Sequence, residues 1–258
     1  MTPIDRPGGW PAVSGLAGKV AVVTAAGAGI GRATAQGFGA VGSSVVLVDI
    51  DRAAAEESAA GIDGQTAVVC ADVTTADGAA QVVEAALSSF GGIDCLANVV
   101  GGSRPGKDIT EMSEDDWRAM IDFNLTSTYQ MCHAVIPAIE RRGGGAVVNV
   151  SSGAGVSGQA KNPGYVAAKA GVIGLTKALA LDHGPKGVRV NCVSPGAVLT
   201  TLMRRNRTEE EIAAFGRHSL VGRVAKPEEL AAVIVFLCGD GASYVMGQMI
   251  EVNGGHAG

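Results

Sequence analysis

Short apolar runs alternate with amphipathic segments along most of the chain. Runs rich in valine, alanine and isoleucine predict strands at 19–25, 44–50, 66–73, 93–100, 145–152, 188–194 and 249–255. Between them, apolar positions at helical spacing and Ser, Thr or Pro in capping positions predict helices near 30–42, 52–60, 76–90, 114–140, 163–183 and 227–239. Uninterrupted apolar runs are typical of strands that are buried on both faces. The pattern therefore predicts an α/β fold with a parallel sheet between two layers of helices.

No internal repeat, low-complexity tract or linker divides this pattern, so a single domain accounts for it. Residues 1–18 lack any helix or strand period and include several prolines, which predicts a flexible N-terminal arm before one domain at 19–258. A barrel would produce the same alternation of strands and helices. The choice between a barrel and an open sheet therefore depends on the first strand-to-helix turn.

Composition and charge narrow the class of protein. Of the 258 residues, 47% are hydrophobic and only 17% are charged, which suits a largely buried parallel sheet. A formal charge of -5 and the lack of a basic tract argue against binding to nucleic-acid phosphates. The opening residues do not resemble a secretory signal, and we expect no apolar run long enough to cross a membrane. We therefore expect a cytoplasmic protein with no nucleic-acid or membrane partner.

The cysteines and histidines do not predict a metal site. The cysteines are far apart and lie mostly in apolar runs, so we expect buried free thiols at Cys70, Cys95, Cys132, Cys192 and Cys238. The histidines form no HExxH or paired ligand spacing, so we expect surface or interface positions for His133, His183, His218 and His256.

The first strand runs directly into "TAAGAGIG", residues 24–31, and the chain continues as a helix. Gly27, Gly29, Ile30 and Gly31 thus lie where the strand becomes a helix. There the backbone turns tightly, and free N–H groups at the helix start favour a phosphate. A tight turn alone would also explain glycines in a chain that has 38 of them. Their placement nevertheless favours a pyrophosphate-binding turn in an open sheet.

The second strand strengthens this interpretation because it ends in Asp49, about twenty residues beyond the glycine turn. A carboxylate at this place can accept hydrogen bonds from the adenosine ribose hydroxyls, and it would repel a 2'-phosphate. No Lys or Arg occupies 25–29 or directly follows Asp49, which leaves Arg32 and Arg52 as distant candidates. The sequence therefore favours NAD over NADP.

Tyr165 and Lys169 stand four positions apart in "NPGYVAAKAGVIG", residues 162–174, where the other residues are mostly small or apolar. On a helix this spacing places the two side chains on one face. A free phenol titrates near 10 and is a poor base at neutral pH. An ammonium group about 4–5 Å away favours the phenolate by roughly 3–4 kcal/mol at an effective dielectric of 20. The pair therefore predicts a proton-transfer site, and the positive ring of an oxidised nicotinamide would act in the same direction.

Further motifs occur in the order typical of one enzyme family. They are the glycine turn at 24–31, Asp72 with Val73, "NVVG" at 98–101, Asn124 in "DFNLT", "NVSS" at 149–152, "YVAAK" at 165–169 and "SPGAVLT" at 194–200. Over about residues 16–255 the chain resembles the compact, non-extended short-chain dehydrogenases/reductases. This resemblance implies a single Rossmann-like, doubly wound domain, with a seven-stranded parallel sheet in the order 3-2-1-4-5-6-7.

The resemblance also assigns roles to individual residues. It implies that Ser152 hydrogen-bonds the substrate oxygen and that Tyr165 exchanges its proton. Lys169 would lower the tyrosine pKa and hold the nicotinamide ribose, while Asn124 would fix a water that links the lysine to solvent. The other implied cofactor contacts lie around the adenine, the adenosine-side ribose and the nicotinamide, at Asp72, Val73, Asn98, Gly101, Pro195, Gly196, Val198 and Thr200.

Two positions depart from the family pattern. Ala25 replaces the usual first glycine of the turn, and a positive φ there would cost an alanine on the order of 1 kcal/mol. We therefore expect a negative φ at Ala25. Val99 and Val100 replace a polar and a small residue in the family's "NNAG", which changes the packing beside the cofactor.

The resemblance further implies a substrate lid near 201–218 and a homotetramer built through the helices at 114–140 and 163–183. Pocket walls are expected from 102–107, 153–160 and 197–215, which are largely small and neutral. They favour a small, uncharged secondary alcohol or ketone as substrate, with NAD as cofactor and no metal. Two other functions stay open: an NADPH-dependent reductase of 3-oxoacyl thioesters, and a non-catalytic protein that senses dinucleotides.

Overall fold

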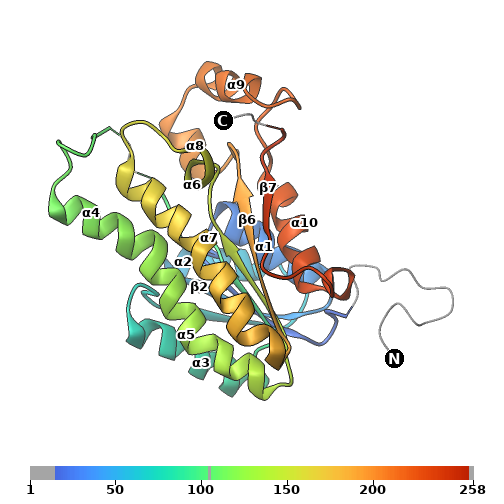
Figure 1. Cartoon of the computed structure of the whole chain (residues 1–258). Helices are drawn as coiled ribbons and strands as arrows, with labels where there is room; N and C mark the ends of the chain where they lie inside the picture. Colours follow the sequence, from blue (N-terminus) through green and yellow to red (C-terminus); the bar gives the residue numbers. More distant parts are fainter. Residues whose placement is uncertain (1–14, 104–105, 256–258) are drawn as a thin grey trace.

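The computed structural model describes residues 15–103 and 106–255. Its sheet has seven parallel strands in the order β3-β2-β1-β4-β5-β6-β7, which confirms the predicted order (Figure 1). The strands are β1 (Val20–Thr24), β2 (Ser44–Asp49), β3 (Thr66–Cys70), β4 (Cys95–Asn98), β5 (Gly145–Val150), β6 (Val188–Pro195) and β7 (Met249–Val252). The reversal of strand order falls between β1 and β4, and open sheets of this kind bind their ligands beyond the carboxyl ends of the strands at such a point.

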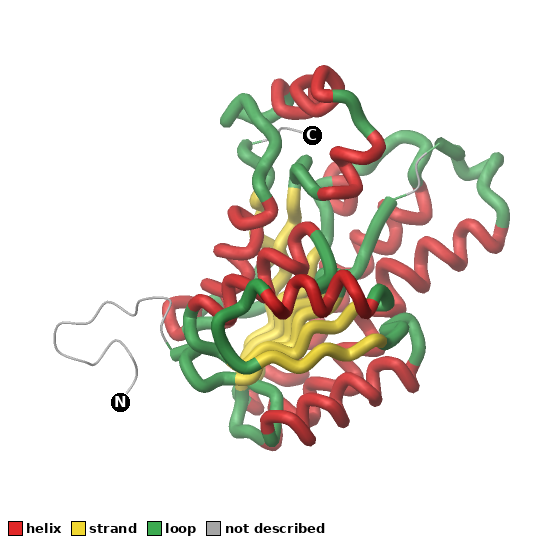
Figure 2. Tube along the Cα trace, turned by 180° about the vertical axis from the view of Figure 1, so that it is seen from behind, coloured by secondary structure: helices red, strands yellow, loops and turns green. Residues whose placement is uncertain are grey.

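Helices cover both faces of the sheet, and Figure 2 shows the strands lying between these two layers. One layer contains α1 (Gly29–Ala40), α2 (Arg52–Ala60) and α10 (Pro227–Cys238). The other contains α3 (Ala76–Phe90), α5 (Ser127–Arg141) and α7 (Pro163–His183). The helices α1, α2, α3, α7 and α10 begin and end within two residues of their predicted bounds. The fold is therefore the predicted doubly wound, Rossmann-like architecture.

Each central strand contributes to two separate cores. In β1, Val22 packs with the α3, α5 and α7 side, whereas Ala21 and Val23 pack with the α1 and α10 side. All three side chains are fully buried. Successive side chains of a strand point to opposite faces, so a strand covered on both faces needs apolar residues at every position. This explains why the strands appear in the sequence as uninterrupted valine-rich runs.

The predicted helix at 114–140 is one long helical segment with an irregularity in its middle. It consists of α4 (Glu114–Ile121), a wider π-helical turn η2 (Asp122–Thr126), and α5. Ser113 begins it with a capping box, in which its hydroxyl accepts from the Asp116 N–H. Single π-turns inside α-helices occur frequently at functional sites. Here the π-turn contains Asn124.

The end of the predicted N-terminal arm belongs to the folded domain. Leu16 is buried in the core beside α10, and its carbonyl accepts a hydrogen bond from the Ser43 hydroxyl at 2.8 Å. The Gly18 N–H donates to the Gly42 carbonyl at 2.9 Å. The prediction of a loose arm is therefore wrong for residues 15–18, because Leu16 gains a buried apolar site. Residues 1–14 of the predicted arm lie outside the described residues.

The segment Pro163–Lys186, which contains α7, is long and apolar enough by length and composition to span a membrane. Our expectation that no segment reaches this length is therefore wrong. The apolar content has another physical reason in this fold, because α7 packs against β6 and α4. A third of its most apolar window is buried. Small residues along α7 allow this close packing.

The cysteine prediction holds for four of the five thiols. All five are free, and Cys95, Cys132, Cys192 and Cys238 are buried. Cys70 is exposed, because it ends the edge strand β3 and no further strand covers it. The two histidines with exposed side chains are His133 and His218, while His183 is partly buried against Glu140. His256 lies outside the described residues.

Ala25 adopts a left-handed backbone conformation with φ of 52°, so the predicted negative φ is wrong. The tight packing of the turn explains this. A Cβ atom placed on Gly31 would lie only 1.9 Å from the Ala25 carbonyl oxygen. The start of α1 therefore touches the backbone of the turn, which forces residue 25 into the conformation that glycine adopts without strain. For an alanine this conformation costs about 1–2 kcal/mol.

Replacing this alanine should therefore stabilise the protein. We expect Ala25→Gly to raise the melting temperature by roughly 1–3 °C, because the relief of backbone strain exceeds the entropy that glycine adds to the unfolded chain. Gly31→Ala should lower it, since the new Cβ has no room. The measurement is thermal unfolding followed by circular dichroism.

Gly174→Ala is the matched control for these variants. A Cβ at Gly174 meets nothing within 4 Å, and the residue lies inside α7. This change should stabilise the protein by up to about 1 kcal/mol through helix propensity alone. A lower melting temperature for Ala25→Gly would contradict the strained conformation.

Candidate active site

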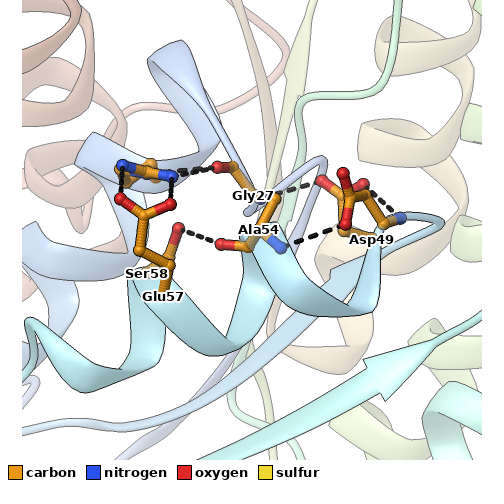
Figure 3. A network of polar contacts seen from close by, with 7 residues as sticks. Gly27, Asp49, Ala54, Glu57 and Ser58 are labelled. Carbon is orange, nitrogen blue, oxygen red and sulfur yellow. Dashed lines mark hydrogen bonds and ion pairs between the residues drawn. The ribbon is translucent and has the colours of Figure 1, made fainter.

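The glycine turn is held in place by the carboxylate at the end of β2 (Figure 3). Asp49 Oδ2 accepts a hydrogen bond from the Gly27 N–H at 2.8 Å, and Asp49 Oδ1 accepts from the Asp51 N–H at 3.0 Å. Asp51 in turn caps α2 by accepting from the Ala54 N–H at 3.1 Å. The turn, the acid and the start of α2 thus form one rigid unit. It keeps a negative charge beside the place where an adenosine ribose would lie.

The two arginines that could hold a 2'-phosphate are already engaged. Arg32 donates to the Gly27 carbonyl from Nη2 at 2.7 Å and pairs with Glu57 at 3.2 Å. Arg52 pairs with Glu56 at 3.6 Å. Each arginine therefore has an acidic neighbour that offsets its charge.

The beginning of α1 fits the pyrophosphate of a dinucleotide. Its N-cap residue, Ala28, has no side-chain oxygen, so no side chain of the turn caps the first N–H groups of the helix. Gly29 faces Thr200, because a Cβ on Gly29 would lie 3.2 Å from Thr200 Cγ2. The structure therefore brings the glycine turn and the "SPGAVLT" segment together across a narrow gap, where uncapped N–H groups favour an anion.

The segment after β6 is fixed from both sides. The Pro195 carbonyl accepts from the Gly153 N–H at 3.0 Å, and Val198 forms an isolated bridge with Ala225. Gly196 lies against Asn253, since a Cβ on Gly196 would come within 3.0 Å of Asn253 Cα. Thr200 caps α8 (Thr201–Asn206) by accepting from the Met203 N–H at 3.2 Å. The predicted nicotinamide-side residues thus belong to one well-supported segment.

The predicted contact between Asn98 and the adenosine-side ribose stays a prediction, and the Asn98 side chain makes hydrogen bonds within the core. Its side chain is buried, and its Nδ2 donates to Asn149 Oδ1 at 2.9 Å. Asn149 Nδ2 continues the chain of hydrogen bonds to the Thr176 hydroxyl of α7 at 3.0 Å. The reason is register, because Asn98 pairs with Asn149 across β4 and β5, and the Asn98 side chain also reaches Cys132 of α5. Only the backbone of Asn98 remains available to a ligand at the sheet edge.

The two valines of "NVVG" are held by backbone hydrogen bonds and by packing of their side chains against the two cores. The N–H groups of Val99 and Val100 both donate to the Thr24 hydroxyl, at 2.9 and 3.3 Å. Val99 packs toward the α1 and α10 side, and Val100 toward the α3 and α5 side. Thr24 is a site-positioning residue that the sequence did not reveal, since it looks like any buried strand residue.

The predicted adenine contacts have local structural roles as well. Asp72 Oδ1 accepts from the N–H and the hydroxyl of Thr74, at 2.9 and 2.7 Å. Val73 is buried in the core beside α3. Their contact with adenine stays a prediction.

Ser152 and Tyr165 meet where β5 ends and α7 begins. Proline at the first position of α7 starts the helix after Asn162, so Tyr165 lies in its first turn. The Ser152 hydroxyl lies beside the Tyr165 phenol, where its hydrogen-bonding effect lowers the pKa of the phenol. Ser152 Oγ also accepts from the Ala154 N–H at 3.2 Å, which orients the serine. The predicted catalytic serine and tyrosine are therefore adjacent.

Lys169 lies one helical turn beyond Tyr165 and is 2% exposed. Its Nζ donates to the Val150 carbonyl at 2.9 Å. Burial lowers the pKa of Lys169 to about 8, and the nearby Cys192 thiol opposes this shift. The Val150 carbonyl is a partner that the sequence could not reveal, because any residue type can supply a backbone oxygen.

Asn124 lies close to the lysine, and both side chains border Gly101. Its Oδ1 accepts from the Gly102 N–H at 2.9 Å, and its Nδ2 donates to the Gly102 and Met120 carbonyls, each at 3.0 Å. A Cβ on Gly101 would lie 2.5 Å from Lys169 Nζ and 2.9 Å from Asn124 Oδ1. A side chain at position 101 would therefore displace the lysine ammonium or the asparagine amide. The structure thus brings together all four predicted catalytic residues: Asn124, Ser152, Tyr165 and Lys169.

Comparison with known proteins agrees with this arrangement. A family model described as enoyl-(acyl carrier protein) reductase matches residues 24–257. The chain is 39% identical to cyclohexanol dehydrogenase of Acinetobacter sp. (strain SE19), with 92% of this chain and 94% of that protein covered. It is 37% identical to 3-oxoacyl-(acyl-carrier-protein) reductase FabG of Thermotoga maritima, with 93% and 98% covered. The chain belongs to the short-chain dehydrogenase/reductase family.

A solved structure of the same family has the same fold. It is L-sorbose reductase from Gluconobacter frateurii, complexed with NADPH and L-sorbose, with a TM-score of 0.87 and 32% identity. The match covers 94% of this chain and 97% of that one. As a member of this family, the protein described by our structure is an oxidoreductase that uses a nicotinamide cofactor.

The tyrosine pKa differs from the expectation that Lys169 lowers it. In this structure burial raises the pKa of Tyr165, and the hydrogen bond from Ser152 opposes the shift. Lys169 Nζ donates to the Val150 carbonyl, and the net shift of the Tyr165 pKa in this structure is upward. The lysine alone therefore does not make the phenol a base.

The predicted lid corresponds to α8 and α9 (Glu209–Arg217), which lie beyond the ends of β6 and β7 (Figure 1). Leu202 is 62% exposed, and the Arg207 guanidinium lies over the Phe215 ring at 5.7 Å. A cavity of about 150 Å³ separates the first turn of α8 from α1 and α10. Exposed apolar residues on such an element suit a segment that closes over a ligand, and closure itself stays a prediction.

The described residues contain no group of three or more His, Cys, Asp or Glu side chains that could hold a metal ion. The proton chemistry of the site rests on the phenol, the hydroxyl and the ammonium.

The buried lysine predicts a specific pH dependence of stability. Its folded-state pKa of about 8 lies below the ordinary lysine value of 10.5, so the unfolded chain binds more protons between these values. Stability should therefore rise with pH from about 8 to 10.5. We expect Lys169→Met to raise the free energy of unfolding at pH 7 by up to about 3 kcal/mol, because it removes the penalty of the buried charge.

This gain should shrink as the pH approaches 10, where the lysine of the parent protein is neutral in the fold. Urea unfolding of both proteins at pH 7 and pH 10 provides the measurement. Lys177→Met, at an exposed position of α7, is the control and should change stability little at either pH. A difference in the free energy of unfolding between Lys169→Met and the parent protein that grows with pH would contradict the burial of a charged lysine.

Proposed function

We propose that this protein is an NAD-dependent dehydrogenase/reductase that interconverts a small, uncharged secondary alcohol and its ketone. The observation that carries the proposal is the placement of Ser152 beside Tyr165, with the buried Lys169 one helical turn further along α7. Similarity to a cyclohexanol dehydrogenase supports an alcohol as the substrate. The neutral, small residues expected around the site support an uncharged one.

Each catalytic group has a role that its position supports. Tyr165 accepts the proton of the alcohol in oxidation and returns it in reduction. Ser152 donates a hydrogen bond to the same oxygen as its negative charge develops. A bound nicotinamide dinucleotide supplies the hydride acceptor or donor. Lys169, held by the Val150 carbonyl, keeps a positive charge near the phenolate and the cofactor ribose.

The tyrosine becomes a base only in the complex with the oxidised cofactor. In the structure burial raises the pKa of Tyr165. A positive ring beside the phenol would favour its charged form, in addition to the Lys169 ammonium. We therefore infer that proton transfer through Tyr165 requires the oxidised cofactor to bind first.

Asp49 supports NAD as the cofactor. One of its oxygens is held by the Gly27 N–H, and its charge would repel a 2'-phosphate. Arg32 and Arg52 each have a glutamate partner. NADP remains the alternative, since the similar L-sorbose reductase structure contains NADPH.

A second candidate function is the NADPH-dependent reduction of 3-oxoacyl thioesters. The observation in its favour is the similarity to a 3-oxoacyl-(acyl-carrier-protein) reductase over nearly the whole chain. The arginines of α8, Arg204 and Arg205, would be the cations nearest to such a charged carrier. Asp49 argues against this second function, because its negative charge disfavours the 2'-phosphate of NADPH.

We further propose a homotetramer in a reducing cytoplasm. The outer surfaces of the two predicted interface helices carry exposed apolar side chains, namely Trp117, Phe123, Tyr129 and Leu181. Free thiols suit a reducing compartment. The lid at α8 and α9 would close over the alcohol and exclude water.

The test is a panel of secondary alcohols with NAD, followed by NADH formation. We expect turnover of at least one alcohol, and Tyr165→Phe should lower kcat/KM by about 100-fold or more while NAD affinity stays within about threefold. Turnover that survives Tyr165→Phe would contradict the proposal. Tight NAD binding with no turnover of any alcohol or ketone would favour the dinucleotide sensor.

The same panel with NADP tests the cofactor choice. We expect at least a tenfold preference of the parent protein for NAD in kcat/KM. Asp49→Asn keeps an oxygen for the Gly27 N–H and removes the charge, so this preference should narrow. Adding Ile50→Arg, at an exposed position next to it, should narrow it further. Tighter binding of NADPH than NADH by the parent protein would instead support the thioester reductase.

A further inference from the structure

Three polar side chains meet just before the first turn of α7. Asn162 Nδ2 donates to Ser103 Oγ at 2.6 Å and to Gln159 Oε1 at 2.9 Å. Asn162 is fully buried, whereas Ser103 and Gln159 are exposed. One buried amide therefore fixes two polar groups that remain open to solvent. We call these three residues the amide cluster.

The amide cluster borders the proposed catalytic groups on two sides. Ser103 follows Gly102, which Asn124 holds by hydrogen bonds to its N–H and carbonyl. Asn162 is the N-cap residue of α7, directly before the first turn, which contains Tyr165. The loop after β4 and the start of α7 thus place the amide cluster at the end of α7 that carries the phenol.

The cluster has hydrogen-bonding capacity that the described part of the chain does not use. Asn162 Oδ1 is buried without a partner among these residues. An asparagine at a helix N-cap normally accepts from the N–H groups of the first turn, but Asn162 makes no such bond. Its orientation is therefore set by Ser103 and Gln159. The Ser103 hydroxyl proton and Gln159 Nε2 are also available as donors.

We propose that Ser103 and Gln159, positioned by Asn162, bind a second hydroxyl group of the substrate. The preferred substrate class is then a vicinal diol or a polyol, in which one carbinol reacts at Tyr165 and its neighbour contacts the amide cluster. The second hydroxyl of the substrate can accept hydrogen bonds from both the Ser103 hydroxyl and Gln159 Nε2, and it has a proton of its own to donate. A site with oriented polar groups discriminates against an analogue that lacks the hydroxyl, because those groups would lose their partner. This inference rests on the proposed alcohol chemistry.

The test compares three ring alcohols with saturating NAD: trans-cyclohexane-1,2-diol, 2-methylcyclohexanol and cyclohexanol. The methyl compound controls for bulk at the second position. We expect kcat/KM for the diol, divided by two for its two hydroxyl groups, to exceed the values for both other alcohols by about tenfold or more. Equal values for the diol and cyclohexanol would overturn the proposal.

Variants connect this preference to the amide cluster. Gln159→Met and Ser103→Ala should each lower the ratio of the diol to the cyclohexanol kcat/KM by at least about threefold. Gln81→Met and Ser88→Ala make the same chemical changes on α3, away from the site, and should leave the ratio unchanged. A ratio that stays constant in all four variants would contradict the proposed contacts.

Asn162 is a positioning residue and needs a separate readout. Asn162→Leu should lower the ratio mainly through a higher KM for the diol. If this variant loses stability in thermal unfolding, Gln159→Met and Ser103→Ala carry the test. A fall in kcat for all three alcohols with an unchanged ratio would show a purely structural role and contradict the proposal.

Equilibrium binding separates this inference from the proposed function. Calorimetry with Tyr165→Phe and NAD needs no turnover, and the diol should bind about tenfold more tightly than cyclohexanol. If the diol binds preferentially but no alcohol is oxidised by the parent protein, the proposed function fails while the second-hydroxyl site stands. If alcohols are oxidised without any diol preference in binding or turnover, only the second-hydroxyl site fails.

Discussion

The burial of one ammonium group constrains the centre of this structure. Lys169 is almost completely buried, and its lowered pKa shows that this burial is unfavourable for the charge. A single carbonyl, that of Val150, accepts its hydrogen bond. The neighbouring chain lies close to this lysine: a Cβ atom on Gly101 would meet Lys169 Nζ, and α6 (Ala154–Ser157) packs closely on the α7 backbone at Lys169. A charge held at a cost in stability is expected where function, rather than folding, selects the residue.

The other half of the site is organised by a negative charge and a strained turn. Asp49 holds the Gly27 N–H, and the contact between Gly31 and the Ala25 carbonyl keeps the first helix close to the first strand. Together they leave the beginning of α1 without a side-chain cap and facing Thr200. The two halves lie at the same edge of the sheet, because β1, β5 and β6 are parallel and all end there. This common edge lets a cofactor span the distance between the carboxylate and the phenol.

Much of this architecture could be predicted from the sequence, because it depends on repeated, local signals. Valine-rich runs gave the strands, and Tyr165 and Lys169 could be placed on one helix face from their spacing alone. The remaining features depend on contacts between distant segments. The left-handed Ala25 results from packing against Gly31, the inward Asn98 from its register with Asn149, and the buried Leu16 from a site beside α10. The raised pKa of Tyr165 likewise reflects burial, which the sequence does not specify.

The central claim is that Tyr165 becomes a base through the combined effect of the Lys169 ammonium and the oxidised cofactor. The most direct test is a spectrophotometric titration of its phenolate, with the signal of Tyr165→Phe subtracted to remove Tyr129 and Tyr244. We expect Tyr165 to ionise at a clearly lower pH in the presence of saturating NAD than without it, and we expect Lys169→Met to reduce this difference. Ionisation at the same pH with and without NAD would contradict it.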